Sequence, residues 1–388
     1  MKEIFIITSY FPPETGAASN RIYHLAGGLQ KKNFNVSVIT PLPNYPTGQI
    51  FSGFKGKFKM STNEKGIHVH RLWIYASNSK NKFLRLLAML SYSFSLIWFF
   101  MWNKIPQQVI VQSPPLLVAF TSMFFLRSRN RKLILNVSDL WPIAGLELGA
   151  FKRNSSYRIL EKIERFNYKT ADFVMGQSEE ILNHISSICP NKKTFLYRNY
   201  PGFELSKLNI ETPESTNKIK LVYAGLLGIA QGVFKLCQSL DYNGYEFHIY
   251  GTGAERKNIQ EFITARPELP IYYHGEITRD ALHPILLTYD LAIIPLSNRI
   301  FGSVPSKIFE YAKLGVPMLY FGGGEGEMIV ENYQLGWIAR AGDYTHLNEV
   351  ISSFKKTEFS KEKREQIRKT AVDNFNFELQ LEQLVHLL

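Results

Sequence analysis

Residues 303–321 read SVPSKIFEYAKLGVPMLYF, and this stretch carries the signals of a helix that leads into a buried strand. Pro305 suits the first turn of a helix, where an amide hydrogen would have no partner. Gly315 followed by Pro317 marks the end of the helix. The apolar run 318–321 then predicts a short buried strand. A helix that leads directly into a buried strand is typical of a parallel α/β sheet.

Two charged residues of this helix, Lys307 and Glu310, are three positions apart and therefore share one face. The N-terminal end of a helix attracts anions through its unpaired N–H groups and its dipole. One interpretation is that a phosphate binds Lys307 and the helix N-terminus while Glu310 binds a pair of sugar hydroxyls. The alternative is an exposed Lys–Glu pair on a surface helix, which is a common arrangement.

The composition indicates a large globular chain. Its 388 residues suggest two or three domains, and the 45% of hydrophobic residues are enough for a sizeable core. Cys189 and Cys237 are far apart, which excludes a disulfide framework and the usual zinc spacings. We expect no signal peptide, because Lys2 precedes a strand-like run, and we expect a chain that works in the reducing cytoplasm.

The net charge of +12 favours anionic partners such as nucleic acid, acidic lipid or phosphorylated substrates. No zinc finger, RNP motif or repeated basic–aromatic pattern indicates nucleic acid, so we expect no nucleic-acid partner. The basic clusters 55–59, 80–85 and 127–132 flank very apolar segments. This arrangement indicates an anionic membrane surface instead.

The chain begins with a β–loop–α–β unit. A buried strand is predicted over 3–8, a helix over about 19–32 and a second strand over 35–40. Gly16 lies just before the helix, where the absence of a side chain lets the backbone approach a ligand. Simple loop geometry explains this glycine equally well.

Two apolar runs, 84–102 and 114–126, are predicted as helices of an α/β domain. The first has no charge after Arg85 and is just long enough to span a bilayer, which takes about 20 residues. We expect these helices to pack in the domain, with apolar and basic parts that lie on a membrane. A spanning helix and a fully buried helix without any membrane role are the alternatives.

A carboxylate, Asp139, follows the strand predicted over 132–137. The carboxyl end of a strand is where α/β proteins place active-site groups, so Asp139 is a candidate catalytic residue. The alternative is that Asp139 caps the N-terminus of the following helix.

A polar stretch, residues 205–218, predicts a linker, after which the α/β rhythm restarts. We expect an N-terminal domain over 1–204 and a C-terminal domain over 219–371, with the tail 372–388 packed back on the first. Two doubly wound halves would place a ligand cleft between the carboxyl edges of their strands. In the second half, strands are predicted at 219–224, 246–250, 271–274 and 291–295, with helices from about 233, 254 and 279.

Three glycine-rich turns follow strands of the second half, at 225–232, 251–253 and 322–324. Backbone N–H groups at such turns can cradle phosphate oxygens. Together with Lys307 they predict a ligand with a diphosphate. There is no Asp-x-Asp and no His/carboxylate cluster with metal spacing, so we expect no metal and no cofactor, with the charge neutralised by Lys307, helix dipoles and amides. The sequence has no Gly-x-Ser-x-Gly elbow that would indicate acyl transfer.

These motifs together resemble the GT-B, family four, nucleotide-sugar glycosyltransferases of bacterial polysaccharide assembly. SYFPPETGAASNR, residues 9–21, is similar to the N-terminal donor/acceptor loop of the family. Asp139-Leu140-Trp141-Pro142 is similar to a motif of the branch that acts on lipid-linked acceptors. The segments 223–232, 249–253 and 305–310 look like the donor-binding signatures.

The resemblance implies two facing Rossmann-like domains, the first for the acceptor and the second for a nucleoside-diphosphate sugar. Glu310 would hold the ribose hydroxyls, while Lys307, Gly228 and the Gly16 loop would surround the diphosphate. Lys307 and Asp139 are the catalytic candidates. The donor-binding candidates are Gly16, Asn199, Gly228, Gln231, Gly251, Gly253, Ser306, Lys307 and Glu310.

The family retains the anomeric configuration, with the departing phosphate oxygen taking the acceptor proton, so no protein nucleophile is expected. The resemblance implies transfer of a hexose-type sugar, from a UDP-sugar, to a lipid-pyrophosphate-linked glycan in surface polysaccharide synthesis. The enzyme would be cytoplasmic and peripheral on the inner face of the membrane. A sugar-nucleotide epimerase of the same fold and a non-catalytic nucleotide-sugar-binding scaffold are the alternatives.

The chain departs from the family at three positions. Leu226 and Gln231 stand where many relatives carry an arginine and a lysine on the diphosphate. The first glutamate of the E-x7-E pattern would fall at Gly302. These changes remove polar contacts to the donor, so we expect the site to depend more strongly on Lys307.

Overall fold

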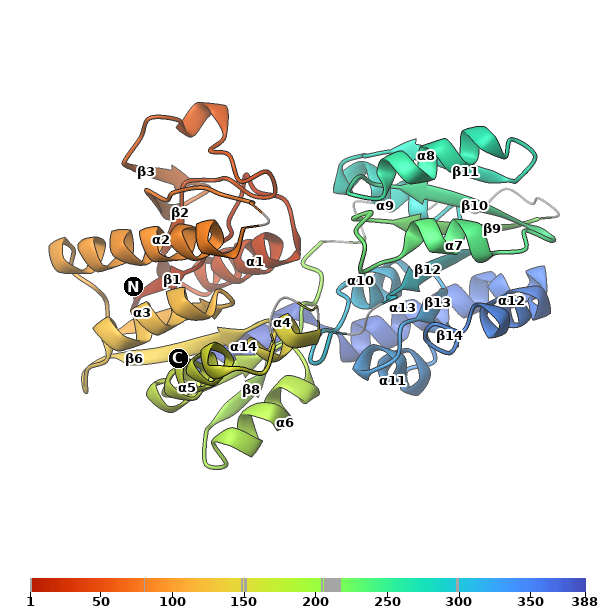
Figure 1. The fold of residues 1–388 in the computed structure, drawn as a ribbon. Coiled ribbons are helices and arrows are strands. Elements are labelled where there is room, and N and C mark those ends of the chain that lie inside the picture. Colours follow the sequence, from red (N-terminus) through yellow and green to blue (C-terminus); the bar gives the residue numbers. More distant parts are fainter. Residues whose placement is uncertain are drawn as a thin grey trace. The chain divides into compact units, whose positions relative to one another are not determined.

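The computed structural model describes residues 2–79, 81–147, 149, 152–203, 205, 218–297 and 300–388. The chain divides into two compact units (Figure 1). Unit 1 contains residues 1–199, 300–303 and 378–388, and unit 2 contains residues 200–299 and 304–377. The two-domain α/β fold with parallel sheets that the sequence predicts is confirmed.

Among the described residues of unit 1, eight strands form one sheet in the order β3-β4-β2-β1-β5-β6-β7-β8. Apart from the antiparallel pair β3–β4, neighbouring strands run parallel. The pair β3–β4 forms a hairpin, with its turn at Lys65 and Gly66. The strands are β1 (Lys2–Ile7), β2 (Phe34–Pro41), β3 (Lys59–Glu64), β4 (Ile67–Leu72), β5 (Gln108–Ser113), β6 (Lys132–Val137), β7 (Phe173–Gly176) and β8 (Thr194–Leu196).

The helices of unit 1 cover this sheet, and α2 and α3 pack against each other (Figure 1). Their bounds are α1 (Ala17–Lys31), α2 (Lys82–Trp102), α3 (Leu116–Leu126), α4 (Ile143–Glu147), α5 (Ser155–Thr170), α6 (Glu179–Ile188) and α14 (Phe377–Leu387). A short 3-10 helix spans Ser52–Phe54.

The C-terminal helix α14 belongs to unit 1, although the chain reaches it from unit 2. Gln380 bridges both backbone groups of Arg198, accepting from its N–H at 2.8 Å and donating to its carbonyl at 3.0 Å. Gln108 and Lys132, at the starts of two central strands, donate to the last two carbonyls of the chain. The tail is thus fastened at both of its ends.

Unit 2 is a second parallel α/β layer structure. Its described residues form a six-stranded parallel sheet in the order β11-β10-β9-β12-β13-β14. The strands are β9 (Ile219–Ala224), β10 (Tyr245–Tyr250), β11 (Ile271–Gly275), β12 (Leu291–Pro295), β13 (Met318–Phe321) and β14 (Gly336–Ile338). The helices are α7 (Val233–Ser239), α8 (Arg256–Ala265), α9 (Arg279–Leu286), α10 (Lys307–Leu314), α11 (Glu325–Asn332), α12 (Tyr344–Ser353) and α13 (Lys361–Asn374), with a 3-10 helix over Lys356–Phe359.

The stretch 303–321 forms the predicted helix and strand, as α10 and β13. Gly315 has φ 74°, the left-handed conformation that ends a helix without steric cost to glycine. The helix begins later than Pro305 suggests, because Ser306 occupies the capping position and Pro305 lies before it. Ile308 and Phe309 face the core as the sequence pattern requires, with at most 1% of each exposed.

The expected linker, 205–218, lies outside the described residues except for Leu205 and Lys218. On its two sides, unit 1 ends at Asn199 and β9 begins at Ile219. Residues 372–377 of the expected tail stay with unit 2, whereas residues 378–388 belong to unit 1.

Candidate functional site

Two glycine turns of unit 2 are hydrogen-bonded to each other at the carboxyl ends of β9 and β10. The amide of Gly225 donates to the carbonyl of Tyr250 at 2.9 Å, and the amide of Leu227 donates to the carbonyl of Thr252 at 2.9 Å. These bonds continue the pairing of the strands into the loops. At this edge of the sheet, the two turns that follow β9 and β10 therefore lie against each other through their backbones.

Glycine is required where these turns touch. Gly251 has φ 131°, and a Cβ atom there would lie 1.8 Å from the carbonyl oxygen of Gly225. Gly253 has φ 154°, and its Cβ would lie 2.5 Å from the carbonyl oxygen of Leu227. Neither contact is possible for a side chain, so these glycines are needed for the turns to pack.

Lys307, the first residue of α10, lies over the first of these turns. Its Nζ is 4.2 Å from the centre of the Tyr223 ring, and a Cβ atom on Gly225 would come within 2.3 Å of it. Burial lowers the pKa of Lys307 to about 8, although the charge of Glu310 acts in the opposite direction. The amine is thus still mostly protonated at pH 7.

Lys307 has an aromatic ring beside its charge but takes part in none of the ion pairs described for this chain. A partly buried ammonium group is costly unless an anion compensates it. Its position at the start of a helix, above exposed backbone, favours binding of an anionic ligand.

Glu310 lies one turn further along α10 and is held by α9. Its Oε1 accepts from Nε of Arg279 at 2.9 Å and from Nε2 of His283 at 2.8 Å. Burial raises the pKa of Glu310, but His283 and Arg279 stabilise the carboxylate more strongly and bring the pKa to about 2. The side chain is only 13% exposed. The structure therefore excludes an exposed Lys307–Glu310 surface pair.

The loop 225–232 closes back on itself before α7. The amide of Gln231 donates to the carbonyl of Gly228 at 3.1 Å, and a Cβ on Gly228 would lie 2.6 Å from the side-chain oxygen of Gln231. Ser297 at the end of β12 donates to the loop carbonyls of Ile229 and Ala230. Leu226 is 56% exposed on this loop.

The third glycine turn, 322–324, differs from the other two. It leads into α11, whose first turn carries Glu325 and Glu327. These carboxylates already occupy the positive end of the helix dipole, so this turn is a poor phosphate site. It is better suited to the hydroxyl groups of a neutral ligand. Tyr320 fixes the turn by donating to the carbonyl of Gly323 at 3.1 Å.

Unit 1 has a polar cluster at the carboxyl ends of β6 and β7. Arg21 of α1, only 2% exposed, donates through Nη2 to Asn136 at 2.6 Å and to the carbonyl of Tyr197 at 3.1 Å. Asp139 lies just after β6, where burial raises its pKa to about 6 against the opposing charge of Arg21. Because α4 begins only at Ile143, the N-cap interpretation of Asp139 is wrong.

The loop before α1 is ordered by a carboxylate. Glu14, which is buried, accepts from the amides of Asn44 at 2.7 Å and Tyr45 at 2.8 Å. Gly16 follows this anchor, and a Cβ there would make only an ordinary 3.7 Å contact with Tyr45. Gly16 therefore leaves open backbone at the start of α1.

The departure at Gly302 has a structural cause. Gly302 is packed in unit 1, where its amide donates to Glu180 at 2.9 Å and its carbonyl accepts from Ser178 at 2.7 Å. Its φ is 82°, and a Cβ would lie 2.9 Å from Ile181. A glutamate would not fit at this position without rearrangement.

The structure brings together Gly228, Gln231, Gly251, Gly253, Ser306, Lys307 and Glu310 within unit 2, around the ends of β9 and β10 and the start of α10. Gly16, Asp139 and Asn199 belong to unit 1. Among the described residues, no group of three or more His, Cys, Asp or Glu side chains is placed to hold a metal ion.

Two family models match the chain one after the other. Residues 16–193 match the glycosyl transferase 4-like domain, and residues 207–373 match the glycosyl transferases group 1 model. Both of the units thus correspond to domains of one kind of enzyme. The chain is a glycosyltransferase.

The fold of this glycosyltransferase is the GT-B fold of several solved structures. Sucrose-phosphate synthase from Thermosynechococcus elongatus has a TM-score of 0.77 at 13% identity, with 100% of this chain and 98% of that chain covered. HepE from Anabaena, in complex with UDP and glucose, has a TM-score of 0.68 at 13% identity, with 100% of this chain and 99% of that chain covered. WaaG, a glycosyltransferase involved in lipopolysaccharide biosynthesis, has a TM-score of 0.67 at 12% identity, with 99% of each chain covered. No curated protein sequence matches the chain.

Two residues that shape the glycosyltransferase site, Arg279 and His283, are missing from the sequence-based candidates, whereas Tyr223 and Gly225 lie within the donor-binding signature 223–232. Arg279 and His283 are four positions apart and so share one face of α9, which is a signal that the sequence does contain. Their common partner Glu310 is 27 residues beyond His283, a pairing that only the fold provides.

The packing of the two turns makes a testable prediction. Gly251→Ala should destabilise unit 2 by at least about 2 kcal/mol more than Gly244→Ala, measured by chemical denaturation. Gly244 is the matched control, because its φ is 83° but a Cβ there meets nothing within 4 Å. It should cost only the strain of a left-handed alanine, about 1 kcal/mol. Equal losses for the two variants would contradict the proposed backbone contact.

Proposed function

We propose that this glycosyltransferase moves a hexose-type sugar from a UDP-linked donor to a lipid-pyrophosphate-linked glycan in surface polysaccharide synthesis, with retention. The observation that supports the donor is the Lys307 ammonium group, which lies above bare backbone at the start of α10 and takes part in none of the ion pairs among the described residues. A diphosphate supplies the missing negative charge.

In this proposal, the diphosphate lies on Lys307 and the turns of Gly228, Gly251 and Gly253. Glu310 is an ionised acceptor at all working pH values, because its pKa is about 2. Both described contacts to this carboxylate fall on Oε1, and we assign Oε2 to the ribose hydroxyls. The choice of UDP follows the neighbours, since HepE was solved with UDP and glucose and the trehalose-6-phosphate protein of E. coli with UDP-2-fluoro glucose.

The chemical step breaks the bond between the anomeric carbon and the phosphate oxygen, which leaves additional negative charge on the diphosphate. A fixed cation beside that oxygen stabilises the transition state more than the ground state. We assign this role to Lys307 in place of a metal ion. The departing phosphate oxygen takes the acceptor proton on the same face of the sugar. No protein nucleophile forms part of the proposal.

Asp139 is assigned to the acceptor. Its pKa of about 6 leaves it mostly ionised at neutral pH, so it can accept a hydrogen bond from the attacking hydroxyl and orient it. Gly16 and Asn199 of unit 1, and Gln231 and Ser306 of unit 2, are the further binding candidates of this proposal.

The lipid-linked acceptor places the proposed reaction at the inner face of the cytoplasmic membrane, with the enzyme as a peripheral protein. WaaG is involved in lipopolysaccharide biosynthesis, which supports an acceptor of this kind. Within the described residues, one helix, Phe83–Trp102 in α2, is long and apolar enough to cross a membrane. Its packing in unit 1 favours a surface position instead.

The proposed role of Lys307 can be tested by transfer of radiolabelled sugar from UDP-sugars to membrane lipid extracts. Lys307→Ala should lower kcat by about 100-fold, because the charge acts mainly in the transition state. Lys235→Ala is the matched control, since Lys235 also lies over a ring, 4.9 Å from that of Tyr344, and should change kcat less than about twofold.

Unchanged turnover in Lys307→Ala would remove this lysine from the mechanism. Donor binding by the parent enzyme without transfer to any lipid extract would contradict the glycosyltransferase proposal and support the scaffold alternative.

The pKa of Lys307 predicts how donor binding depends on pH. As pH rises through about 8, the free enzyme loses the ammonium charge that binds the diphosphate. Between pH 7 and 9 the affinity for UDP-glucose should fall by about tenfold, measured by calorimetry. Lys307→Arg keeps its charge over this range and should show a much flatter profile. The same slope in both proteins, or none in the parent, would contradict the assignment.

A further inference from the structure

The outward face of α2 carries a continuous apolar stripe. Phe83, Leu90, Phe94, Trp98 and Trp102 recur at helical spacing and are 69%, 49%, 59%, 52% and 69% exposed. Isolated exposed apolar residues are ordinary, but a contiguous apolar surface indicates an interaction site. The stripe runs along the whole length of the helix.

The opposite face of α2 is fixed to the core of unit 1. Tyr92, Leu96 and Phe99 are buried there, at most 3% exposed. The Tyr92 hydroxyl lies 2.9 Å from the carbonyl oxygen of Thr8 and 3.2 Å from that of Ile39, at the ends of β1 and β2. A helix with one face in a protein core and the other exposed suits the plane of a membrane interface. It does not suit a path across the bilayer.

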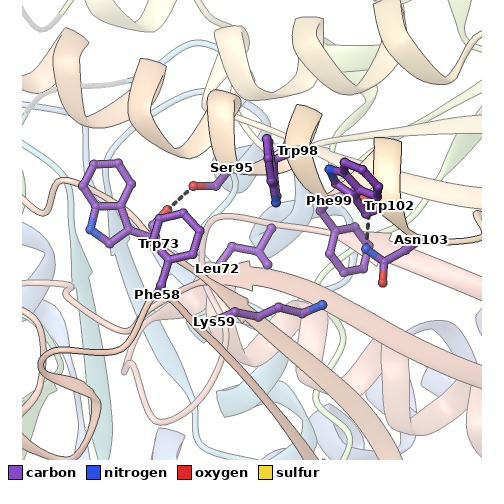
Figure 2. Close-up of a pocket in the computed structure, with 9 residues that line it drawn as sticks. All are labelled: Phe58, Lys59, Leu72, Trp73, Ser95, Trp98, Phe99, Trp102 and Asn103. Carbon is purple, nitrogen blue, oxygen red and sulfur yellow. Dashed lines mark hydrogen bonds between the residues drawn. The ribbon is translucent and has the colours of Figure 1, made fainter.

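A cavity of about 100 Å³ opens at the C-terminal end of the stripe (Figure 2). Trp98 and Trp102 of α2 line it from one side, while Phe58, Lys59 and Trp73 line it from the β3–β4 hairpin. The rings of Phe58 and Trp73 are stacked, with an interplanar angle of 16°. The cavity is thus walled mainly by aromatic rings.

Two neutral polar side chains of the cavity, Ser95 and Asn103, each donate a hydrogen bond to the backbone. Ser95 donates to the carbonyl of Trp73 at 2.8 Å, and Asn103 donates to the carbonyl of Phe99 at 2.8 Å (Figure 2). A sugar would need such groups for its hydroxyls. What the cavity offers is an apolar wall and the ammonium of Lys59, 5.1 Å from the centre of the Phe99 ring. This chemistry fits a hydrocarbon chain with an anionic head.

The charge around the stripe is strongly one-sided. Between Glu14 and Asp139 the sequence contains sixteen lysines and arginines and a single acidic residue, Glu64. That carboxylate is already paired with Arg71 at 2.5 Å. Next to α2, Arg127 lies 4.2 Å from the ring centre of Phe124, which is 39% exposed on α3. Positive charge therefore predominates in the segment of sequence that contains the stripe, as anionic lipid headgroups require.

We propose that the stripe of α2 lies in the interface of an anionic bilayer and that the aromatic cavity receives part of the acyl chain of one phospholipid. Its acyl chain lies against Trp98 and Trp102, and its phosphate lies at Lys59. The inference rests on the proposed function for its biological purpose, because a lipid-linked acceptor requires the enzyme at the membrane. Its test uses neither donor nor acceptor.

The first test is co-sedimentation of the full chain with vesicles of phosphatidylglycerol and phosphatidylcholine. The parent should bind, and Phe94→Asp should bind at least about tenfold more weakly, because a charge enters the apolar interface. Val372→Asp is the matched control, a helical position of α13 that is 56% exposed, and it should bind as the parent does.

Binding of lipid in the cavity can be measured through the fluorescence of the tryptophans that line it. Three of the five tryptophans, Trp73, Trp98 and Trp102, line it. Brominated phosphatidylglycerol in the vesicles should therefore quench a large part of the fluorescence of the parent protein. Lys59→Glu should weaken binding to these vesicles by about fivefold or more, and high salt should reduce binding of the parent. The Lys59→Glu effect should vanish on pure phosphatidylcholine.

Equal vesicle binding by Phe94→Asp and Val372→Asp, or no quenching by brominated lipid, would overturn the proposal. So would a parent dimer that Phe94→Asp converts to a monomer while vesicle binding is absent, because the stripe would then be covered by a second copy. Nucleotide binding by the variants shows that they are folded. Lipid binding without sugar transfer would count only against the proposed function, and transfer without lipid binding only against this inference.

Discussion

The site depends on the contact between the Lys307 ammonium group and the bare backbone of the turn at Gly225. The amine occupies the space that a side chain on Gly225 would need, and it lies over the ring of Tyr223. The absence of a side chain on Gly225 thus leaves room for the ammonium group of Lys307. Because the charge is partly buried, its pKa is lowered to about 8, and an anion is needed to compensate it.

The neighbouring elements follow from this constraint. Gly251 must lack a side chain because its turn lies against that of Gly225. Glu310 cannot neutralise Lys307 fully, because Arg279 and His283 of α9 engage it. The helix α10 thus presents a cation at its first residue, over the ring of Tyr223, and an anion one turn later that is held by α9. This separation lets one helix bind both a phosphate and a hydroxyl group.

Much of the fold could be predicted from local signals in the sequence. The buried apolar runs predict the first and last residues of β9, β12 and β13 correctly, and α10 ends at Gly315 as expected. The long-range partners could not be predicted. Nothing near Gly302 in the sequence indicates that it packs against Ile181, and this packing explains why the family glutamate is absent there. The turn 322–324 matched a phosphate loop in composition, but Glu325 and Glu327 make it unsuitable.

The most direct test of the central claim is a thermal-shift panel with UDP, GDP, ADP and their common sugars, with and without EDTA. The account predicts that UDP and its sugars raise the Tm of the parent, that EDTA leaves this shift unchanged, and that Lys307→Ala loses most of it. No shift with any nucleotide, or an equal shift in Lys307→Ala, would contradict the claim that Lys307 forms a diphosphate site.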